Sequence, residues 1–402
     1  KGKVVDSAEI GPDSKILKVK QASSDFTKRQ QTNQLNIAVL QFGDDAEVAQ
    51  VLTTKTTDIV KAIDKLELKG ERIAVPAEDA CSLVNAIFVK IGCSSKTAGQ
   101  VAEHLVDTSL CGMESHGLMW TLQYAEQFET GQMRPDVKPR LRTTPRGVTE
   151  VDGCHGIGIP AMKMAVEHGC EVARKQSMSA LAIRNVGHTG RLGEFTEMAA
   201  QSGCLCIVIG GGGRQRWRQV APYGGRCAML PTNPYSIGIP GGDRGPVVLD
   251  FATSKIAGGW IYAARSAGAL LPDNALMDAD GNVTRDPEDY FRGGAIMPAG
   301  GAKGYALALV AEMIAEAMLG PVTTEGNWLM ITLDASRFRE PSAMQTAAEE
   351  LLQELRHCPP APGFDKVEVP GEREREHRQR TEESGISLPE KTWQQIVSLS
   401  DR

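Results

Sequence analysis

The chain has 402 residues, of which 41% are hydrophobic and 23% are charged, and its formal net charge is -6. This length is enough for two or three packed units with substantial cores. The mildly acidic balance, without a basic block, argues against nucleic acid or a membrane surface as partner. No run of about 18 apolar residues is present that could span a bilayer. We therefore expect no nucleic acid and no membrane as partner.

The nine cysteines are scattered, which favours a reducing compartment over a secreted location. Only Cys204 and Cys206 are closely spaced, in an apolar run that predicts a strand. Two ligands on one strand face are conceivable, but no second pair completes a metal site, so we predict none. Because the chain starts at Lys1 rather than Met, a removed leader stays open. We expect a cytoplasmic location, with the mitochondrial matrix as the alternative.

Residues 1–70 are the least interpretable part of the chain, and we treat them as an extension of unknown role. Within them, residues 35–42 could form a strand, and residues 46–68 have mixed helical character. A surface arm or docking segment is the favoured interpretation.

Residues 71–145 are predicted to form a helical segment. Apolar residues recur with helical spacing, and the helix ends carry proline, serine and glycine at the positions where these residues start or stop a helix. We predict helices between Pro76 and Gly92, between Ser94 and Gly112, and from Gly117 to about Glu129.

Residues 146–335 alternate between strand and helix patterns, which predicts an α/β domain with a partly parallel sheet. Residues 336–402 are predicted to be a helical segment that packs back on the first. The predicted strands cover 148–152, 179–186, 204–210, 235–239, 247–251 and 328–333. The predicted helices cover 160–175, 190–202, 302–319, 343–357 and 388–400.

The run from Gly156 through Gly158 to Ala161 matches the G-x-G-x-x-A dinucleotide fingerprint between a strand and a helix. Pro160, however, removes an N–H from the turn that should face the pyrophosphate. No acidic residue follows about 20 positions later to hold a ribose. We therefore favour the other use of these glycines, which is to pack a helix closely against a strand.

Ser115, His116 and Gly117 lie between two predicted helices, where the imidazole can reach a ligand and transfer a proton near neutral pH. The alternative is a histidine that caps a helix or sits on the surface.

Four glycines at 210–213 follow an apolar strand and precede Arg214, Arg216 and Arg218. Glycine N–H groups and paired arginine donors would suit a diphosphate or the 2′-phosphate of NADP. A flexible, solvated loop is an equal alternative. The cluster does not separate NAD from NADP.

Three single residues also follow strands or precede a helix at positions where ligands bind. His188 could line a cleft or cap the next helix. Asp250, at a strand end, could orient an imidazole, hold a ribose hydroxyl or cap a turn. Lys303, at the head of an apolar helix, could bind an anion or simply be solvated.

Several short motifs occur along the chain. No single motif is specific, but their order and spacing are specific as a set. The motifs are E-S-H-G at 114–117, G-Q-M-R-P at 131–135, R-N-V-G-H-T-G at 184–190, V-A-P-Y-G-G at 220–225, T-N-P at 232–234, V-L-D-F-A-T-S at 248–254, G-G-A-K-G-Y at 300–305 and P-G-E-R-E at 370–374. With these motifs, the chain resembles the type 2 malate/L-lactate dehydrogenase family over residues 75–400. That family includes sulfolactate, ureidoglycolate, diketogulonate and cyclic imino-acid oxidoreductases.

The resemblance implies a non-Rossmann α/β fold, in which a helical layer packs beside a mixed β-sheet nucleotide-binding domain. It implies an NAD- or NADP-dependent oxidoreductase that forms a homodimer and transfers a hydride between the cofactor and a 2-oxo acid/2-hydroxy acid pair. His116 would be the general acid and base. The alternatives are a cyclic imino-acid (C=N) reductase and an inactive family member that serves as a structural subunit.

The resemblance also assigns roles to individual residues. The catalytic residues would be His116, Ser115 and Asp250. The cofactor-binding residues would be His188, Gly211, Gly212, Arg214, Thr232, Asn233, Asp250, Ala252, Lys303, Gly304, Gly371, Glu372 and Arg373. The substrate-binding residues would be Ser115, Trp120, Arg184 and Thr232.

The chain departs from the family pattern at Trp120, where the family has an arginine that can clamp a substrate carboxylate. Either another arginine, such as Arg184 or Arg191, replaces it, or the substrate is not a simple 2-oxo acid. Pro231 stands where the family has glycine, and the segment between Gly320 and Trp328 is shorter.

Overall fold

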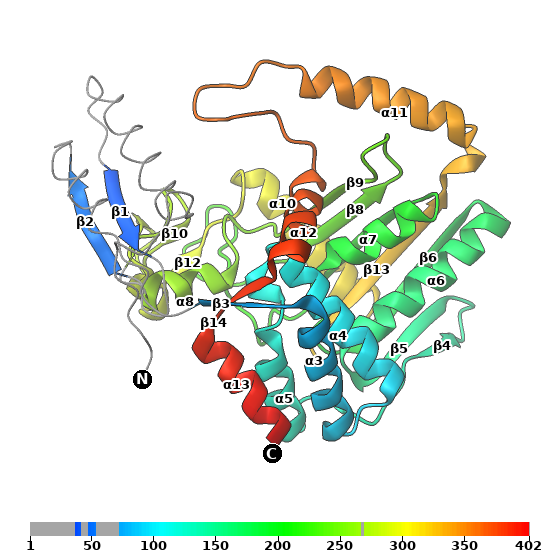
Figure 1. Cartoon of the computed structure of the whole chain (residues 1–402), viewed down its shortest axis with the longest axis horizontal. Coiled ribbons are helices and arrows are strands. Elements are labelled where there is room, and N and C mark those ends of the chain that lie inside the picture. The colour runs from blue at the N-terminus through cyan, green and yellow to red at the C-terminus, as the bar shows by residue number, and fades with distance from the viewer. Residues whose placement is uncertain (1–36, 42–46, 54–71, 267–268, 402) are drawn as a thin grey trace.

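The computed structural model describes residues 37–41, 47–53, 72–266 and 269–401, and Figure 1 shows their arrangement. A helical layer lies against a seven-stranded mixed sheet, and further helices cover the opposite face of that sheet. The mixed α/β architecture that the sequence predicts is therefore present.

The helical layer begins with α3 (Ala77–Ile91), α4 (Ser95–Leu110) and α5 (Trp120–Glu129). Their ends follow the local signals in the sequence. Ser94 caps α4 by accepting a hydrogen bond from the Thr97 N–H at 3.2 Å, and Gly92 ends α3 with φ of 114°. The three predicted helices are thus found where helix-start and helix-stop residues placed them.

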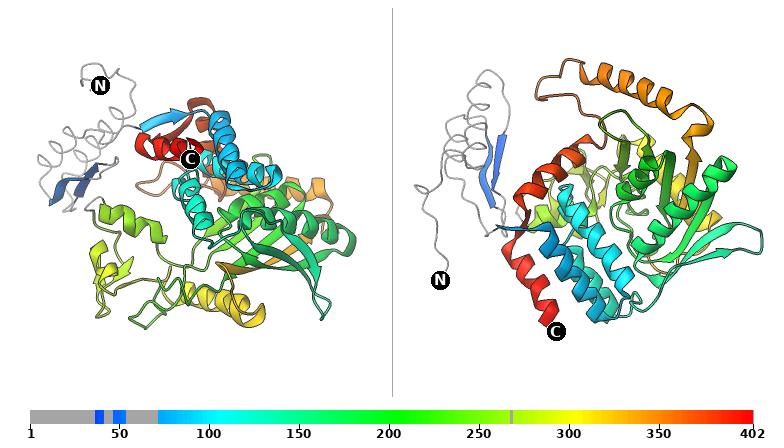
Figure 2. Two further views of the ribbon diagram at one scale, coloured as in Figure 1. Left: turned by 90° about the horizontal axis from the view of Figure 1, so that it is seen from below. Right: turned by 45° about the vertical axis from the view of Figure 1, so that its right-hand side comes forward.

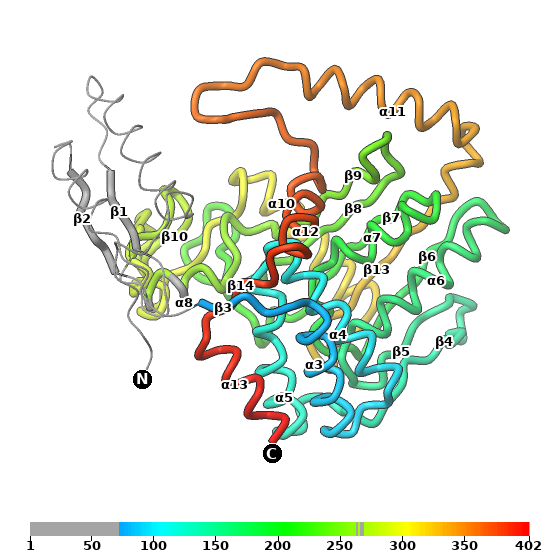
Figure 3. The backbone as a smooth tube through the Cα atoms, viewed as in Figure 1, coloured from blue at the N-terminus to red at the C-terminus, as the bar shows by residue number. Residues whose placement is uncertain are grey.

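The C-terminal part of the chain returns to this layer (Figure 3). Strand β14 (Ile386–Pro389) pairs antiparallel with β3 (Arg72–Val75), α12 (Glu372–Ser384) contacts α4, and α13 (Glu390–Asp401) contacts α3 and α5. Helix α11 (Pro341–Arg356) lies elsewhere. It contacts the loop after β8 through a hydrogen bond of 2.8 Å from the Asp243 N–H to Glu349.

The central sheet has the strand order β4-β5-β6-β13-β7-β8-β9. Its strands are β4 (Arg140–Thr143), β5 (Thr149–Gly156), β6 (Met178–Val186), β7 (Cys204–Gly211), β8 (Tyr235–Ile239), β9 (Val247–Phe251) and β13 (Gly326–Asp334). Only β5 and β6 pair in parallel, because β13 inserts antiparallel between β6 and β7. Without that late strand, β6 and β7 would be parallel neighbours, as the alternating pattern suggests.

Alternation along β7 separates the two faces of the sheet. Cys204 and Cys206 point to the face covered by α6 (Gly158–Gln176) and α7 (Leu192–Gln201), and they belong to the main core. Gly211 points to the other face, against Glu312 of α10 (Ala302–Glu312). Because α4 contacts α6, the helical layer stacks on the α6 and α7 side, as Figure 2 shows.

A smaller lobe surrounds the three-stranded sheet β11-β10-β12, which the sequence did not predict. It has its own core of Leu276, Ile296, Ile261 and Leu271. Its elements are β10 (Leu276–Met277), β11 (Val283–Thr284), β12 (Ala295–Ile296), α8 (Gly258–Ser266) and α9 (Pro287–Phe291). The strands have two residues each, which is too short for a periodic signal in the sequence.

One sequence prediction is corrected. Glu47–Thr53, in the stretch with helical character, forms strand β2 and pairs antiparallel with β1 (Ile37–Gln41); the rest of residues 1–71 lies outside the described residues.

The glycines of the rejected dinucleotide fingerprint have a packing role. A Cβ on Gly158 would lie 2.6 Å from the Gly187 carbonyl oxygen, and one on Gly156 would lie 2.7 Å from a methyl of Val137. These glycines let α6 start close to the loop after β6, in agreement with the interpretation from the sequence.

A buried polar network joins the helical layer to the α/β layer. His104 of α4 contacts the Glu194 carboxylate of α7 through Nδ1, and Lys163 of α6 lies 3.2 Å from the same carboxylate. His104 Nε2 accepts a hydrogen bond of 3.0 Å from the Arg191 N–H. Burial would raise the pKa of Glu194, but His104, Lys163 and Arg191 outweigh burial and hold it at about 2.

We predict that Glu194→Gln lowers the free energy of unfolding by about 3 kcal/mol, because it removes the nearer charge partner of the buried Lys163 and the carboxylate that His104 Nδ1 contacts. Urea unfolding measures this. In the wild-type protein, this contribution is present above pH 4.5, the ordinary pKa of glutamate, and is lost as the pH falls toward about 2. The control is Glu171→Gln, which removes an exposed pair with Lys175 and should leave the unfolding midpoint unchanged.

Candidate active site

The segment between α4 and α5 presents Ser115 and His116 on the short 3₁₀ turn η2 (Glu114–His116). Ser109 Oγ accepts a hydrogen bond of 2.9 Å from the Leu118 N–H. The same oxygen lies so close to Gly117 that a Cβ at that position would be 2.1 Å from it. Glycine at 117 is therefore required for this close crossing. The turn holds Ser115 Oγ 3.0 Å from His116 Nδ1.

A cluster of aromatic rings from three segments is centred on His188 and includes His116. His188, from the loop after β6, lies with its ring centroid 5.8 Å from that of His116. Trp120 stacks on His188 at 3.7 Å with an angle of 5° between the planes, and its indole N–H donates to the Ser115 carbonyl at 2.6 Å. Tyr124 OH lies 2.8 Å from His188 Nδ1. The structure thus brings together Ser115, His116, Trp120 and His188, which lie up to about 70 residues apart in the sequence.

Both histidines have lowered pKa values. Burial lowers the pKa of His116, and the nearby charge of His104 adds to the effect. Burial, followed by His116 and His104, lowers the pKa of His188 well below its ordinary value. Near neutral pH, both rings are therefore neutral, so His116 is ready to accept a proton and becomes a strong donor once protonated.

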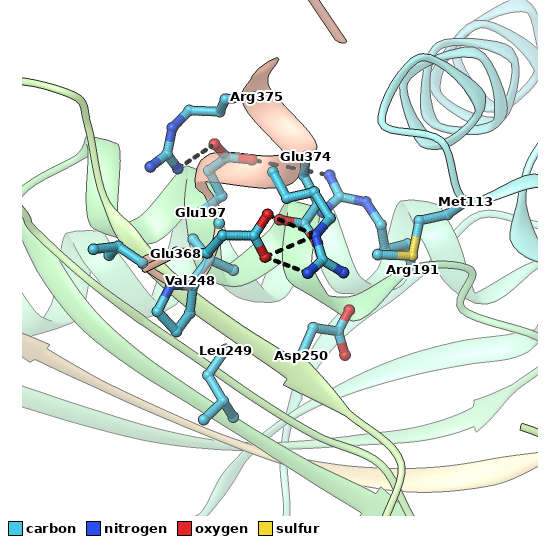
Figure 4. A pocket seen from close by; sticks show the side chains of 13 residues that line it. Met113, Arg191, Glu197, Val248, Leu249, Asp250, Glu368, Glu374 and Arg375 are labelled. Carbon is cyan, nitrogen blue, oxygen red and sulfur yellow. Dashed lines mark hydrogen bonds and ion pairs between the residues drawn. The ribbon is translucent and has the colours of Figure 1, made fainter. Parts of the chain in front are cut away.

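A pocket of about 310 Å³ lies between β9, the start of α12 and the loop after α4 (Figure 4), and its lining includes Met113 and Arg191 but none of the residues of the aromatic cluster. Asp250 at the end of β9 lines it, and the Gly193 N–H donates to Asp250 Oδ2 at 2.7 Å. Protein crowded around the carboxyl raises the pKa of Asp250, while the Gly193 N–H and Arg191 oppose that rise. No described residue donates to the second oxygen, which faces the pocket.

Each arginine of this pocket is paired with a carboxylate of the chain. Arg191 lies 3.0 Å from Asp107, Arg375 lies 3.7 Å from Glu197, and Arg373 contacts Glu368. Of the predicted residues 371–373, Gly371 and Arg373 line the pocket. Glu372 does not, because it is buried and pairs with Arg356 at 2.6 Å.

The glycine-rich loop after β7 is occupied by a carboxylate of the chain itself. Glu312 of α10 accepts hydrogen bonds from the Gly212 N–H at 2.9 Å and from Asn233 Nδ2 at 2.8 Å. Arg214 makes two hydrogen bonds to Glu316, at 2.7 and 3.1 Å. The N–H groups that the sequence suggests for a phosphate are therefore directed at Glu312, and no resemblance motif includes this glutamate.

Other predicted site residues lie away from the first pocket. The Thr232 carbonyl accepts hydrogen bonds from Thr253, which follows Ala252. Lys303, which precedes Gly304, is exposed, and no described residue pairs with its side-chain ammonium group. Gly300 and Gly301, just before Lys303, line a second pocket of about 520 Å³. Of the predicted cofactor residues, Asp250, Gly371 and Arg373 line the first pocket, and none lines the second. Arg184 is 3.8 Å from Glu150 and is not paired with the histidine cluster.

Three site residues were missed in the sequence. Tyr124 follows Trp120 by one helical turn, so the shared helix face was the available signal. Glu312 and Glu325 had no local signal, because their partners come from distant segments. Burial raises the pKa of Glu325 to about 7, although Arg216 acts to lower it. Burial also raises the pKa of Tyr124, and the charge of Glu325 adds to that rise.

Comparison with known proteins places this site in a family. The malate/L-lactate dehydrogenase family model matches residues 75–397. The chain belongs to the malate/L-lactate dehydrogenase family. This confirms the resemblance drawn from the motifs, and with it the fold class. The members found by comparison are dehydrogenases and reductases.

Three relatives illustrate the range of this malate/L-lactate dehydrogenase family. A Delta(1)-pyrroline-2-carboxylate/Delta(1)-piperideine-2-carboxylate reductase from Pseudomonas putida is 29% identical, covering 81% of this chain and 97% of that protein. An L-lactate dehydrogenase from Cupriavidus necator is 31% identical, covering 75% and 90%. The solved sulfolactate dehydrogenase from Methanocaldococcus jannaschii is 28% identical, with a TM-score of 0.73, covering 82% and 97%.

None of the described helices of this family member is long and apolar enough to cross a membrane. Among the described residues, no group of three or more His, Cys, Asp or Glu side chains is placed to hold a metal ion.

We predict that the stability of the protein falls as the pH rises from about 4.5 to about 7, in part because of Glu325. In this window the unfolded chain has released the Glu325 proton, whereas the folded protein still binds it. Glu325→Gln should reduce the slope of unfolding free energy against pH, measured by urea unfolding across the window. The exposed Glu350→Gln is the control. An unchanged slope in Glu325→Gln would contradict the raised pKa.

Proposed function

We propose that the protein is an NAD(P)-dependent oxidoreductase that transfers a hydride between a nicotinamide cofactor and a 2-oxo acid/2-hydroxy acid pair. The observation that carries this proposal is the placement of His116, which is held by Ser115 and lies beside His188, in a family of dehydrogenases and reductases.

The first pocket fits part of a dinucleotide. Its volume, about 310 Å³, is at the low end for small-molecule sites. The uncommitted oxygen of Asp250 suits a ribose hydroxyl, and Gly371 and Arg373 form the opposite wall. For the phosphates, Lys303 and the N-terminus of α10 are better placed than the Gly212 loop, since Glu312 already fills that loop. His188, Thr232 and Asn233 would border the reacting end.

Proton transfer is the part of the reaction that the chain itself performs. When bound, the cofactor supplies a hydride to the carbon of a C=O or C=N group. Charge then develops on the oxygen or nitrogen, and His116, as imidazolium, protonates it; in the reverse direction, neutral His116 removes the proton. Because Ser115 occupies Nδ1, Nε2 is the atom that exchanges the proton with the substrate.

Reduction of a cyclic imino acid is the second candidate, and the stack of Trp120 on His188 favours it. The indole supplies a flat apolar wall where the family pattern has an arginine. Arg191 and Arg184, the candidate replacements, are engaged with carboxylates. The Pseudomonas putida relative is named for reduction of such cyclic substrates.

We also propose a homodimer in the cytoplasm. Apolar side chains are exposed along α10 and the π-helical turn that follows it, η3 (Met313–Met318), which is typical of a protein contact. They are Leu307, Leu309, Val310, Met313 and Met318. The nine free cysteines are consistent with a reducing compartment. Light scattering of the purified protein measures the oligomeric state.

We predict that NADH or NADPH binds with micromolar affinity, measured by nicotinamide fluorescence. Asp250→Asn should weaken the preferred cofactor about tenfold, because it replaces a charged acceptor while keeping an oxygen for the Gly193 N–H. The control is Asp273→Asn on the exposed surface. Absence of binding of both cofactors at millimolar concentration would overturn the oxidoreductase proposal and favour a structural subunit.

We predict that His116→Ala lowers kcat/KM by about 10²- to 10⁴-fold while cofactor binding is retained. His357→Ala, an exposed histidine at the end of α11, is the matched control. In the wild type, reduction should slow as the pH rises through a pKa below 6.5, because burial lowers the pKa of the acid. A panel of 2-oxo acids and cyclic imines identifies the substrate, and full activity of His116→Ala would remove His116 from the mechanism.

A further inference from the structure

Tyr124 is fully buried on α5, with its hydroxyl 2.8 Å from His188 Nδ1. The Gly190 N–H donates to the same nitrogen at 3.3 Å. A backbone N–H can only donate, so His188 Nδ1 must carry a lone pair and no proton. The Tyr124 hydroxyl is then also a donor to Nδ1. The proton of the neutral ring consequently lies on Nε2.

The surroundings of Tyr124 keep it in the donor state. Burial, together with the charge of Glu325, raises the pKa of Tyr124 well above its ordinary value, so the hydroxyl keeps its proton at neutral pH. Burial and the neighbouring histidines lower the pKa of His188, so its ring stays neutral. A tyrosine that donates and a histidine that accepts are therefore a consistent pair.

The other nitrogen of His188 is free. No described residue forms a hydrogen bond with Nε2, and the residue is partly exposed although Nδ1 is enclosed. Trp120 covers one face of the ring at 3.7 Å and fixes its plane, and the His116 ring lies 5.8 Å away. The result is an oriented N–H donor next to the proposed acid.

We propose that Tyr124 is a positioning residue that holds His188 as the neutral Nε2–H tautomer, and that this N–H donates a hydrogen bond to the substrate oxygen or nitrogen that His116 protonates. A preformed donor aimed at developing charge lowers the barrier, and a neutral one does not compete with His116 as the proton source. The tautomer depends on the geometry alone, whereas the role toward substrate rests on the proposed function.

The test of the tautomer is nitrogen NMR of the full chain labelled with ¹⁵N-histidine, with His188 assigned from its loss in His188→Gln. In the wild type, His188 should show an unprotonated Nδ1 and a protonated Nε2. In Tyr124→Phe, which removes only the hydroxyl, the two nitrogen signals should move toward each other as the tautomers mix. A protonated Nδ1 in the wild type would overturn the tautomer. Unchanged His188 signals in Tyr124→Phe would overturn the positioning role of Tyr124, because the Gly190 N–H would then hold the tautomer without it.

A matched control separates this effect from a general loss of stability. Tyr235→Phe removes another tyrosine hydroxyl, one that donates to the Leu307 carbonyl at 2.9 Å on the opposite side of the sheet. It should leave the His188 signals unchanged. If Tyr235→Phe shifts them as much as Tyr124→Phe does, the effect is not specific and the proposal fails.

Kinetics test the role toward substrate. His188→Ala should lower kcat by about 10²- to 10³-fold, as removal of an oxyanion donor does, and Tyr124→Phe by about tenfold, with the cofactor Kd unchanged in Tyr124→Phe. If cofactor binds and these kcat values equal the wild type, the donor role of His188 is wrong while the function stands. If no cofactor binds to the wild type, the function fails, and the NMR result still decides the tautomer.

Discussion

The buried contact between His104 and the Glu194 carboxylate is the interaction on which the rest of this structure depends. Glu194 also binds Lys163, so a single carboxylate links α4, α6 and α7. On its other side, the His104 ring accepts the Arg191 N–H and leaves room only for glycine at 190. The loop that carries His188 is thereby positioned by the same ring that joins the two layers.

The proposed site lies across this junction, and neither layer contains it alone. The helical layer supplies Ser115, His116 and Tyr124, whereas the α/β layer supplies His188 and Asp250. Buried, neutral imidazoles in contact with aromatic rings are costly to charge. The same low-dielectric environment that lowers their pKa values also strengthens each hydrogen bond that a substrate would form there.

Family membership accounts for the fold of this chain, whereas individual contacts shape its proposed substrate site. The fold is shared with solved relatives at 23% to 29% identity. On the proposed substrate side, Trp120 stacks on His188 where the resemblance implies an arginine, and Glu312 fills the glycine loop. The indole gives the proposed site an apolar wall, and for this reason the cyclic imine stands beside the 2-oxo acid as a candidate substrate.

The sequence by itself determined the elements whose signals are local. Strands Tyr235–Ile239 and Val247–Phe251 were found as predicted, as were the helices marked by Ser94 and Gly92, and the order and spacing of the motifs identified the family. Only the tertiary structure decided that β13 separates β6 from β7, that Glu312 binds the Gly212 loop and that Tyr124 meets His188. Caps, turns and periodicity act over a few residues, whereas these contacts join segments roughly 60 to 150 residues apart, and their energies depend on burial and pairing that arise only after folding.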